Sequence, residues 1–141
     1  MASAREKDLN PNTYIGLSFP LQSDKFNDFA LTKNSLEQAQ HNLKNLLLTH
    51  PGERVGILTF GSNLRKLCFE QINDELPSRI EEEVRNSVST WLSYINVLEV
   101  NTLTEESDSN KIHVQIKYST TLDPTTMNQI ELDASYTADR V

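Results

Sequence analysis

The 141-residue sequence contains 20 Asp and Glu residues against 13 Lys and Arg residues, giving a formal net charge of -7, and 37% of its residues are hydrophobic. This length predicts one domain, and the hydrophobic content suffices for a single core beneath a polar surface. An acidic chain without a Lys and Arg cluster does not favour nucleic-acid binding, because phosphate neutralisation requires concentrated positive charge.

Cysteine content and hydropathy restrict the remaining classes. Cys68 is the single cysteine, so the sequence excludes an intrachain disulfide framework and a Cys-based zinc site. The polar N-terminus lacks a signal-peptide core, and no stretch approaches the ~18 apolar residues of a membrane span. We therefore expect a soluble protein that is made in the cytoplasm and does not bind membranes.

The N-terminal part divides into an arm and the start of a domain. Residues 1–13 are polar and predict a flexible N-terminal arm, while residues 14–141 predict a single domain. Residues 14–21 alternate apolar with small or polar side chains. This alternation predicts a short strand, and Pro20 restricts it to the edge of a sheet.

The first predicted helix begins after Asn34. Asn34 can cap the helix, and Glu37, three residues later, completes a capping box. The apolar positions that follow share one helical face: Leu36, Ala39, Leu43, Leu46 and Leu47. Pro51 and Gly52 predict that the helix ends before them.

Residues 51–61 contain three of the four glycines and predict a turn, an extended piece and a second turn. Ser62 can then cap a short helix. The inward positions of this second helix are Leu64, Leu67, Cys68 and Ile72.

A third helix is predicted over residues 75–94, with either Asp74 or Ser78 as its cap and Pro77 in its first turn. Its apolar positions recur at helical spacing: Ile80, Val84, Val88, Trp91, Leu92 and Ile95.

The apolar period then changes from helical to alternating. Strands are predicted over residues 95–103, 111–118 and 130–136, separated by a polar loop at 105–110 and a turn at Asp123-Pro124. The expected inward residues of the last strand are Ile130, Leu132, Ala134 and Tyr136. The sequence thus predicts an α+β fold with about three helices on one side of a small antiparallel sheet, which ends in a three-stranded meander.

Enzymatic chemistry finds little support in the residue pattern. Paired carboxylates would suit glycoside hydrolysis, but solvated surface positions are the better interpretation of Glu53, Glu70, Glu75 and Glu81. Cys68 occupies an inward helical position, so we expect a buried apolar residue and not a nucleophile. The acidic loop at 105–110 is interpreted as a solvated hairpin connection and not a calcium site.

Metal and cofactor sites are not expected either. The three histidines, His41, His50 and His113, lack metal-ligand spacing. No phosphate-binding glycine loop or dinucleotide motif is present. We therefore expect a protein without metal or cofactor that is not an enzyme.

Residues 43–70 carry a specific resemblance. The segments are Leu43-Lys44-Asn45-Leu46-Leu47-Leu48-Thr49, Gly52-Glu53-Arg54, Phe60-Gly61-Ser62-Asn63-Leu64 and Leu67-Cys68-Phe69-Glu70. Together they resemble the baseplate wedge family of contractile-tailed phages. This family includes the small wedge subunit of T-even-like phages, sometimes labelled lysozyme-like, and is related to the baseplate component of type VI secretion. The order of predicted elements extends the resemblance over residues 14–141.

The sequence departs from the family pattern at two places. The family often has a Glu-Pro-Arg triplet after the long helix, where this chain has Leu92-Ser93-Tyr94. Trp91 and Tyr94 offer an aromatic substitute for that contact. A proline that usually precedes the Phe-Gly pair is replaced by Leu58.

The resemblance implies a structural subunit of a contractile tail baseplate wedge within the virion. It would join other wedge proteins near the tail tube or hub and initiate or anchor the tail sheath by strand pairing. The candidate partner-binding residues are Glu53, Arg54, Trp91, Tyr94, Ile130 and Leu132. Glu53 and Arg54 have an alternative role as an ion pair that stabilises their turn. A peptidoglycan-cleaving lysozyme-like enzyme is the alternative function, and a tailocin or secretion machine is the alternative assembly.

Overall fold

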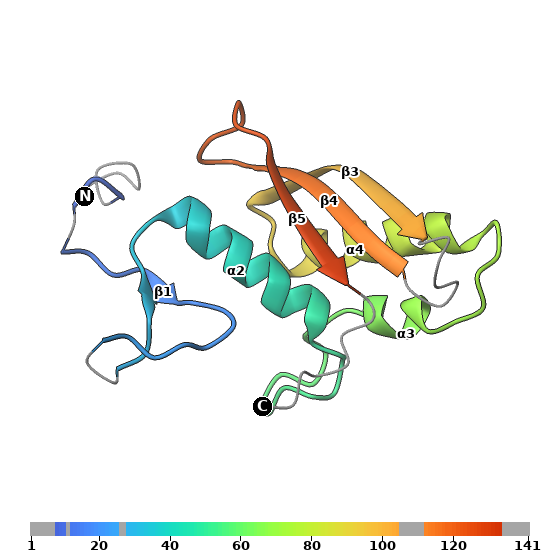
Figure 1. The fold of residues 1–141 in the computed structure, drawn as a ribbon, viewed down its shortest axis with the longest axis horizontal. Coiled ribbons are helices and arrows are strands. Elements are labelled where there is room, and N and C mark those ends of the chain that lie inside the picture. Colours follow the sequence, from blue (N-terminus) through green and yellow to red (C-terminus); the bar gives the residue numbers. More distant parts are fainter. Residues whose placement is uncertain (1–7, 11, 26–27, 105–111, 134–141) are drawn as a thin grey trace.

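The structure is a computed structural model that describes residues 8–10, 12–25, 28–104 and 112–133. The elements in chain order are β1 (Gly16–Leu17), β2 (Leu31–Thr32), α2 (Ser35–Leu48), α3 (Leu64–Cys68), α4 (Leu76–Trp91), β3 (Ile95–Thr104), β4 (Ile112–Thr120) and β5 (Asn128–Asp133). Helices followed by an antiparallel meander in the order β3-β4-β5 confirm the predicted α+β fold (Figure 1).

The predicted N-terminal edge strand is shorter than expected and pairs with a second two-residue strand. β1 covers two residues and pairs antiparallel with β2, with Gly16 opposite Thr32. A Cβ atom on Gly16 would lie 2.5 Å from Oε1 of Gln38, so the absence of a side chain lets β1 approach α2. Strands of two residues give too little alternation to be recognised in a sequence.

The start of α2 confirms half of the predicted capping box. The side-chain oxygen of Asn34 accepts a hydrogen bond from the backbone N–H of Leu36 at 2.8 Å. The reciprocal bond predicted for Glu37 is wrong: its carboxylate instead lies 3.9 Å from Nε2 of His41. Asp8 takes part in its place, because one of its carboxylate oxygens accepts hydrogen bonds from the backbone N–H and the hydroxyl of Ser35 at 3.0 and 2.7 Å.

The N-cap residue of the short helix α3 is Asn63, without a side-chain capping bond, and not the predicted Ser62. Ser62 lies one residue before the N-cap, but its hydroxyl oxygen accepts a hydrogen bond from the backbone N–H of Leu64 at 3.1 Å and so satisfies a free donor of the first turn. Leu64, Leu67 and Cys68 are buried, but the inward placement predicted for Ile72 is wrong, since that side chain is exposed. α3 ends at Cys68, so Ile72 lies beyond the helix that would have turned it inward.

The long helix α4 begins without the predicted side-chain cap. Glu75 precedes it and makes no capping hydrogen bond, so neither Asp74 nor Ser78 acts as the cap. Pro77 lies in the first turn, where its missing N–H costs no hydrogen bond. The apolar face is as predicted, with Ile80, Val84 and Val88 buried.

The meander has one buried and one polar face. On β4 the alternation is as predicted, with Ile112, Val114, Ile116 and Tyr118 buried. The intervening β4 side chains are only partly buried, and this face carries charged and polar pairs such as Lys117 with Glu99. The helices therefore cover one face of the sheet (Figure 1).

The rest of the predicted meander lies partly outside the described residues. The loop at 105–110 and the predicted inward residues Ala134 and Tyr136 are in that group. Within the described ranges, no helix is long and apolar enough to cross a membrane.

Candidate interaction surface

β5 is the outer strand of the meander. The strand order β3-β4-β5 gives it one hydrogen-bonded neighbour, β4, among the residues that the structure describes. In an antiparallel pair, the N–H and C=O groups of every second residue point away from the neighbouring strand. The outer side of β5 therefore presents a row of backbone groups to which a further strand could bond.

The opposite edge of the sheet, β3, is partly blocked. Its pairing with β4 shifts register between Val97 and Glu99, which makes a β-bulge at Leu98. The guanidinium group of Arg85 on α4 donates hydrogen bonds to the carbonyl oxygens of Val97 and Leu98 at 2.8 and 3.3 Å. A bulge and an occupied carbonyl pair both hinder strand addition, so β5 is the more open edge.

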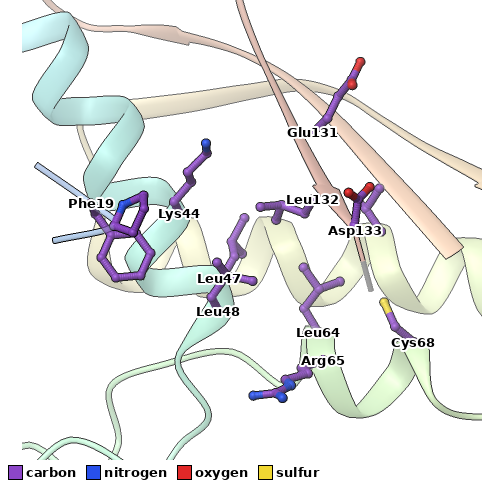
Figure 2. Close-up of a pocket in the computed structure, with 12 residues that line it drawn as sticks. Phe19, Lys44, Leu47, Leu48, Leu64, Arg65, Cys68, Glu131, Leu132 and Asp133 are labelled. Carbon is purple, nitrogen blue, oxygen red and sulfur yellow. The ribbon is translucent and has the colours of Figure 1, made fainter. Parts of the chain in front are cut away.

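A groove of about 380 Å³ lies beside the end of β5. Its walls come from the C-terminal half of α2, from α3, from β4 and β5, and from the segment before β2. The side chains of Leu47, Leu64 and Leu132 point into it, and Lys44 and Arg65 lie at its rim (Figure 2). The complete lining is Phe19, Pro20, Lys44, Leu47, Leu48, Leu64, Arg65, Cys68, Val114, Glu131, Leu132 and Asp133. The groove is thus mainly apolar, with charges at its margin.

Two of the predicted partner-binding residues, Ile130 and Leu132, belong to the core of the protein. Only 2% and 6% of their surfaces are exposed. Their side chains therefore stabilise the fold and form the inner wall beside the groove. What β5 offers at these positions is backbone, together with the part of Leu132 that lines the groove.

The outward side chains of β5 include two carboxylates. Glu131 accepts hydrogen bonds from the side-chain amides of Gln115 and Gln129, each at 3.0 Å. Asp133 is hydrogen-bonded to the ring of His113, a residue that carries charge only when protonated. Among the described residues no Lys or Arg forms an ion pair with either carboxylate, so this end of β5 is negatively charged.

The other edge of the same face is electrostatically different. Lys117 donates a hydrogen bond to the carboxylate of Glu99 at 2.6 Å. This hydrogen bond, with a second one from Asn101, lowers the pKa of Glu99. The Glu99 charge is therefore balanced locally, in contrast to the charges on β5.

A second exposed feature is the loop between α2 and α3, which we call the 49–62 loop. The backbone N–H of Ser62 donates to the carbonyl oxygen of Thr49 at 2.8 Å and closes the loop at its base. Val55 is 97% exposed. Glu53 accepts a hydrogen bond from the backbone N–H of His50 at 2.9 Å and forms no ion pair with Arg54, so the proposed pairing of these two side chains is wrong. Glu53 does stabilise its turn, through the backbone.

Arg54 and Trp91 both contact the aromatic ring of Phe60. The guanidinium carbon of Arg54 lies 4.5 Å from the ring centroid of Phe60, in the range of a cation–π contact. The rings of Phe60 and Trp91 are 5.3 Å apart, edge to face at 68°. Both predicted partner-binding residues are thus attached to the buried Phe60, and Arg54 remains exposed.

Tyr94 has an internal hydrogen bond as well. Its hydroxyl oxygen accepts from the side-chain amide of Asn42 on α2 at 2.8 Å. Asn42 in turn accepts from Gln38 at 2.7 Å, and Gln38 is hydrogen-bonded to the hydroxyl of Thr32 on β2. This chain of side chains connects the two-stranded sheet, α2 and the turn that leads into β3. At this turn, Leu92-Ser93-Tyr94, the sequence departs from the Glu-Pro-Arg pattern of the family.

The residues with catalytic potential are either buried or bonded to other side chains. Burial raises the pKa of the Cys68 thiol to about 11, so the thiolate is scarce at neutral pH. Arg79 donates a hydrogen bond to the Glu70 carboxylate at 2.6 Å. Within the ranges that the structure describes, no group of three or more His, Cys, Asp or Glu residues is placed to hold a metal ion.

Several important features were not found by sequence reasoning. The groove is formed by segments that are distant in the sequence, so no local sequence pattern predicts it. Glu83 accepts a hydrogen bond from the backbone N–H of Asn63 at 2.7 Å, and no sequence spacing connects these two residues. Gln38 and Asn42 do have a signal, because polar side chains four residues apart on a helix can bond to each other.

Three solved structures have the same fold as this chain. A protein from Geobacter sulfurreducens, described as a candidate tail lysozyme, is 23% identical with a TM-score of 0.65, and the match covers 74% of this chain and 93% of that one. A component of the anti-feeding prophage baseplate is 23% identical with a TM-score of 0.66 and coverages of 74% and 82%. A component of the post-contraction baseplate of pyocin R2 is 18% identical with a TM-score of 0.56 and coverages of 71% and 97%.

The sequence comparison is more specific than the fold comparison. No match was found among curated proteins. Residues 34–125, from the cap of α2 to the turn before β5, match the profile of the family described as baseplate wedge protein gp25. This span includes the 49–62 loop and all of α2, α3 and α4. The chain therefore belongs to the gp25 baseplate wedge protein family, and this membership supports a structural role in a baseplate.

Proposed function

We propose that this baseplate subunit initiates or anchors the tail sheath by pairing the outer edge of β5 with a strand of the sheath protein. The observation that carries the proposal is that β5 has one described neighbour and lies beside an apolar groove. Strand addition uses backbone hydrogen bonds for affinity and neighbouring pockets for selectivity. A subunit acting in this way would set the position of the first sheath strands without any catalytic turnover.

The rigidity of β5 supports such a role. Its inward residues Ile130 and Leu132 are buried in the core, and the strand pairs with β4 over its whole length, from Tyr118 opposite Asn128 to His113 opposite Asp133. A template must keep its shape while a partner binds, since ordering a mobile strand would reduce the affinity. β5 meets this requirement.

The 49–62 loop is the proposed contact with other wedge proteins. Its tip presents Val55 and Arg54 to solvent, and its base is closed by the hydrogen bond between Ser62 and Thr49. Glu53 and Trp91 hold the loop in place through His50 and Phe60. We assign partner contact to the exposed parts of Arg54 and Val55, and support of the loop to Glu53 and Trp91. Tyr94 instead bonds to Asn42 and supports the turn before β3.

Hydrogen exchange on the isotope-labelled subunit, alone and mixed with sheath protein, tests the strand pairing. In the free subunit, alternate β5 amides face away from β4 and exchange rapidly. We expect these amides, at every second residue of 128–133, to gain protection when sheath protein is added.

The amides of β3 provide the internal control, because the bulge and Arg85 hinder strand addition there. Protection of the β3 amides without protection of the β5 amides would mean that the sheath strand pairs with β3, and the proposed edge would be wrong. Unchanged exchange throughout β5 at saturating sheath protein would refute the strand-pairing mechanism.

A further inference from the structure

A strand added to β5 would present two rows of side chains to this protein. Successive side chains of a strand point to opposite faces of the sheet. One row would lie on the face of Ile130 and Leu132, and the other on the face of Gln129, Glu131 and Asp133. The surroundings of the two faces differ, so the chemistry of the partner strand can be derived row by row.

The inward row would meet the groove. Leu47, Leu64 and Leu132 line its interior, and its volume of about 380 Å³ is within the range of about 300–1,000 Å³ of pockets that enclose ligands. Apolar side chains gain most from entering such a space. The charged residues of the lining are of both signs, with Lys44 and Arg65 on the helices and Glu131 and Asp133 on β5 (Figure 2).

The outward row would meet negative charge. Glu131 is hydrogen-bonded to neutral amides, and Asp133 has a histidine partner. Directly opposed side chains on neighbouring strands interact, and opposite charges stabilise the pair. Lysine or arginine is therefore the favoured residue in the outward row.

Building on the proposed strand pairing, we infer that the partner strand is amphipathic, with apolar side chains entering the groove and basic side chains facing Glu131 and Asp133. This arrangement also fixes the register. Shifting the strand by one residue would move its apolar row out of the groove and into solvent, and would place its basic row against the apolar side chains of Leu47, Leu64 and Leu132. The groove and the charged face thus select both the sequence and the alignment of the partner.

Short labelled peptides test the inference directly. The probe alternates leucine with lysine and is methylated on alternate backbone nitrogens, which leaves one edge for pairing and prevents self-association. Binding to the full chain is measured by fluorescence anisotropy. Replacing the leucines by serine should weaken binding about tenfold or more, because the apolar burial is lost. Replacing the lysines by glutamate should weaken it by a similar factor, and more so at low salt.

Variants of the protein provide the reciprocal test. Glu131→Lys should abolish the preference for the lysine peptide, whereas Glu82→Lys, on the exposed surface of α4, should leave it unchanged. Leu48→Trp narrows the groove and should weaken the binding of the leucine-lysine peptide about tenfold. Leu122→Trp, at an exposed position between β4 and β5, serves as its control. Circular dichroism confirms that each variant is folded.

The outcomes separate this inference from the proposed function. If sheath protein protects β5 amides but the peptides bind equally whatever their residues, the amphipathic strand is refuted and strand pairing stands. If sheath protein leaves β5 unprotected, strand pairing itself is refuted. If the leucine-lysine peptide binds a chain ending at Asp133 but not the full chain, residues 134–141 are the occupant of the groove, and the assignment to a partner strand is overturned.

Discussion

Phe60 and Trp91 pack edge to face, with ring centroids 5.3 Å apart, and this contact attaches the 49–62 loop to the end of α4. On the same Phe60 ring, the Arg54 guanidinium lies 4.5 Å from the centroid. A residue that looked like a partner contact in the sequence, Trp91, is therefore part of the support for the loop. Arg54, which contacts the same Phe60 ring, is the exposed member of this cluster.

Phe60→Leu should destabilise the protein by about 1–3 kcal/mol, because it removes the aromatic pair with Trp91 and the contact with Arg54. Phe69→Leu is the matched control, since Phe69 is the next phenylalanine in the chain and is exposed. Urea unfolding measures both. Equal effects of the two substitutions would mean that the Phe60 contact contributes nothing of its own.

Gly61→Ala should be severely destabilising, by more than about 3 kcal/mol. Gly61 has a φ of +130°, and a Cβ atom there would lie 2.5 Å from the carbonyl oxygen of Thr49. Gly56→Ala is the control: its φ of +91° is also left-handed, but a Cβ atom would meet open space, so about 1–2 kcal/mol is expected. Thermal unfolding compares them, and a Gly61 variant as stable as the Gly56 variant would contradict the steric explanation.

Glu83→Ala should cost about 1–3 kcal/mol, because it leaves the backbone N–H of Asn63 and the hydroxyls of Ser62 and Ser87 without their shared acceptor. Glu83→Gln should cost less, since its side-chain oxygen can still accept. Glu82→Ala, at an exposed position of the same helix, should change the free energy of unfolding by less than about 0.5 kcal/mol. Chemical denaturation distinguishes the three variants.

Asp123 makes the turn before β5 sensitive to acid. Hydrogen bonds from Thr126 and Thr125 lower its pKa from 3.8 to about 2. The charged form is thus favoured in the folded state, so this contribution to stability is complete above about pH 4 and disappears as the pH falls to about 2. NMR titration of the carboxyl carbon measures the pKa. A midpoint at its ordinary value would contradict the hydrogen-bonded turn, and Asp123→Asn should remove this part of the acid dependence.

The purified protein should not cleave peptidoglycan. Glu70 is paired with Arg79, and Glu53 accepts a hydrogen bond from the backbone of its own loop, whereas a glycosidase needs one carboxyl group that remains protonated to act as an acid. Turbidity loss of purified cell walls is the measurement. Activity that disappears in Glu53→Gln or Glu70→Gln, while both variants remain folded, would establish the enzyme and reject this expectation.

The fold was largely predictable because its long elements have clear periodicity. The buried positions of α4 and β4 follow from apolar residues at helical or alternating spacing, with Val84 and Val114 as examples. Errors occurred where short-range rules competed with distant contacts. Glu37 faces His41 and not the cap, while Asp8, far away in sequence, completes the start of α2.

The candidate interaction surface was predictable only in part. Strand pairing at β5 could be suggested from a terminal strand in a meander, but the sequence alone cannot separate an open edge from a blocked one. The difference depends on Arg85, whose guanidinium bonds the carbonyl of Val97. The groove likewise needs Leu47, Leu64 and Leu132 to be brought together by packing, which no linear pattern specifies.

The hydrogen bonds to Glu83 make the folding of α3 depend on α4. The first turn of α3 depends on an acceptor that belongs to α4, and a helix of five residues has no stability of its own. We therefore expect α3 to form during synthesis only after α4 has been translated. The loop that precedes α3 is also held by Trp91 of α4, so we expect a nascent chain stalled before residue 83 to present an unformed contact surface to its future partners.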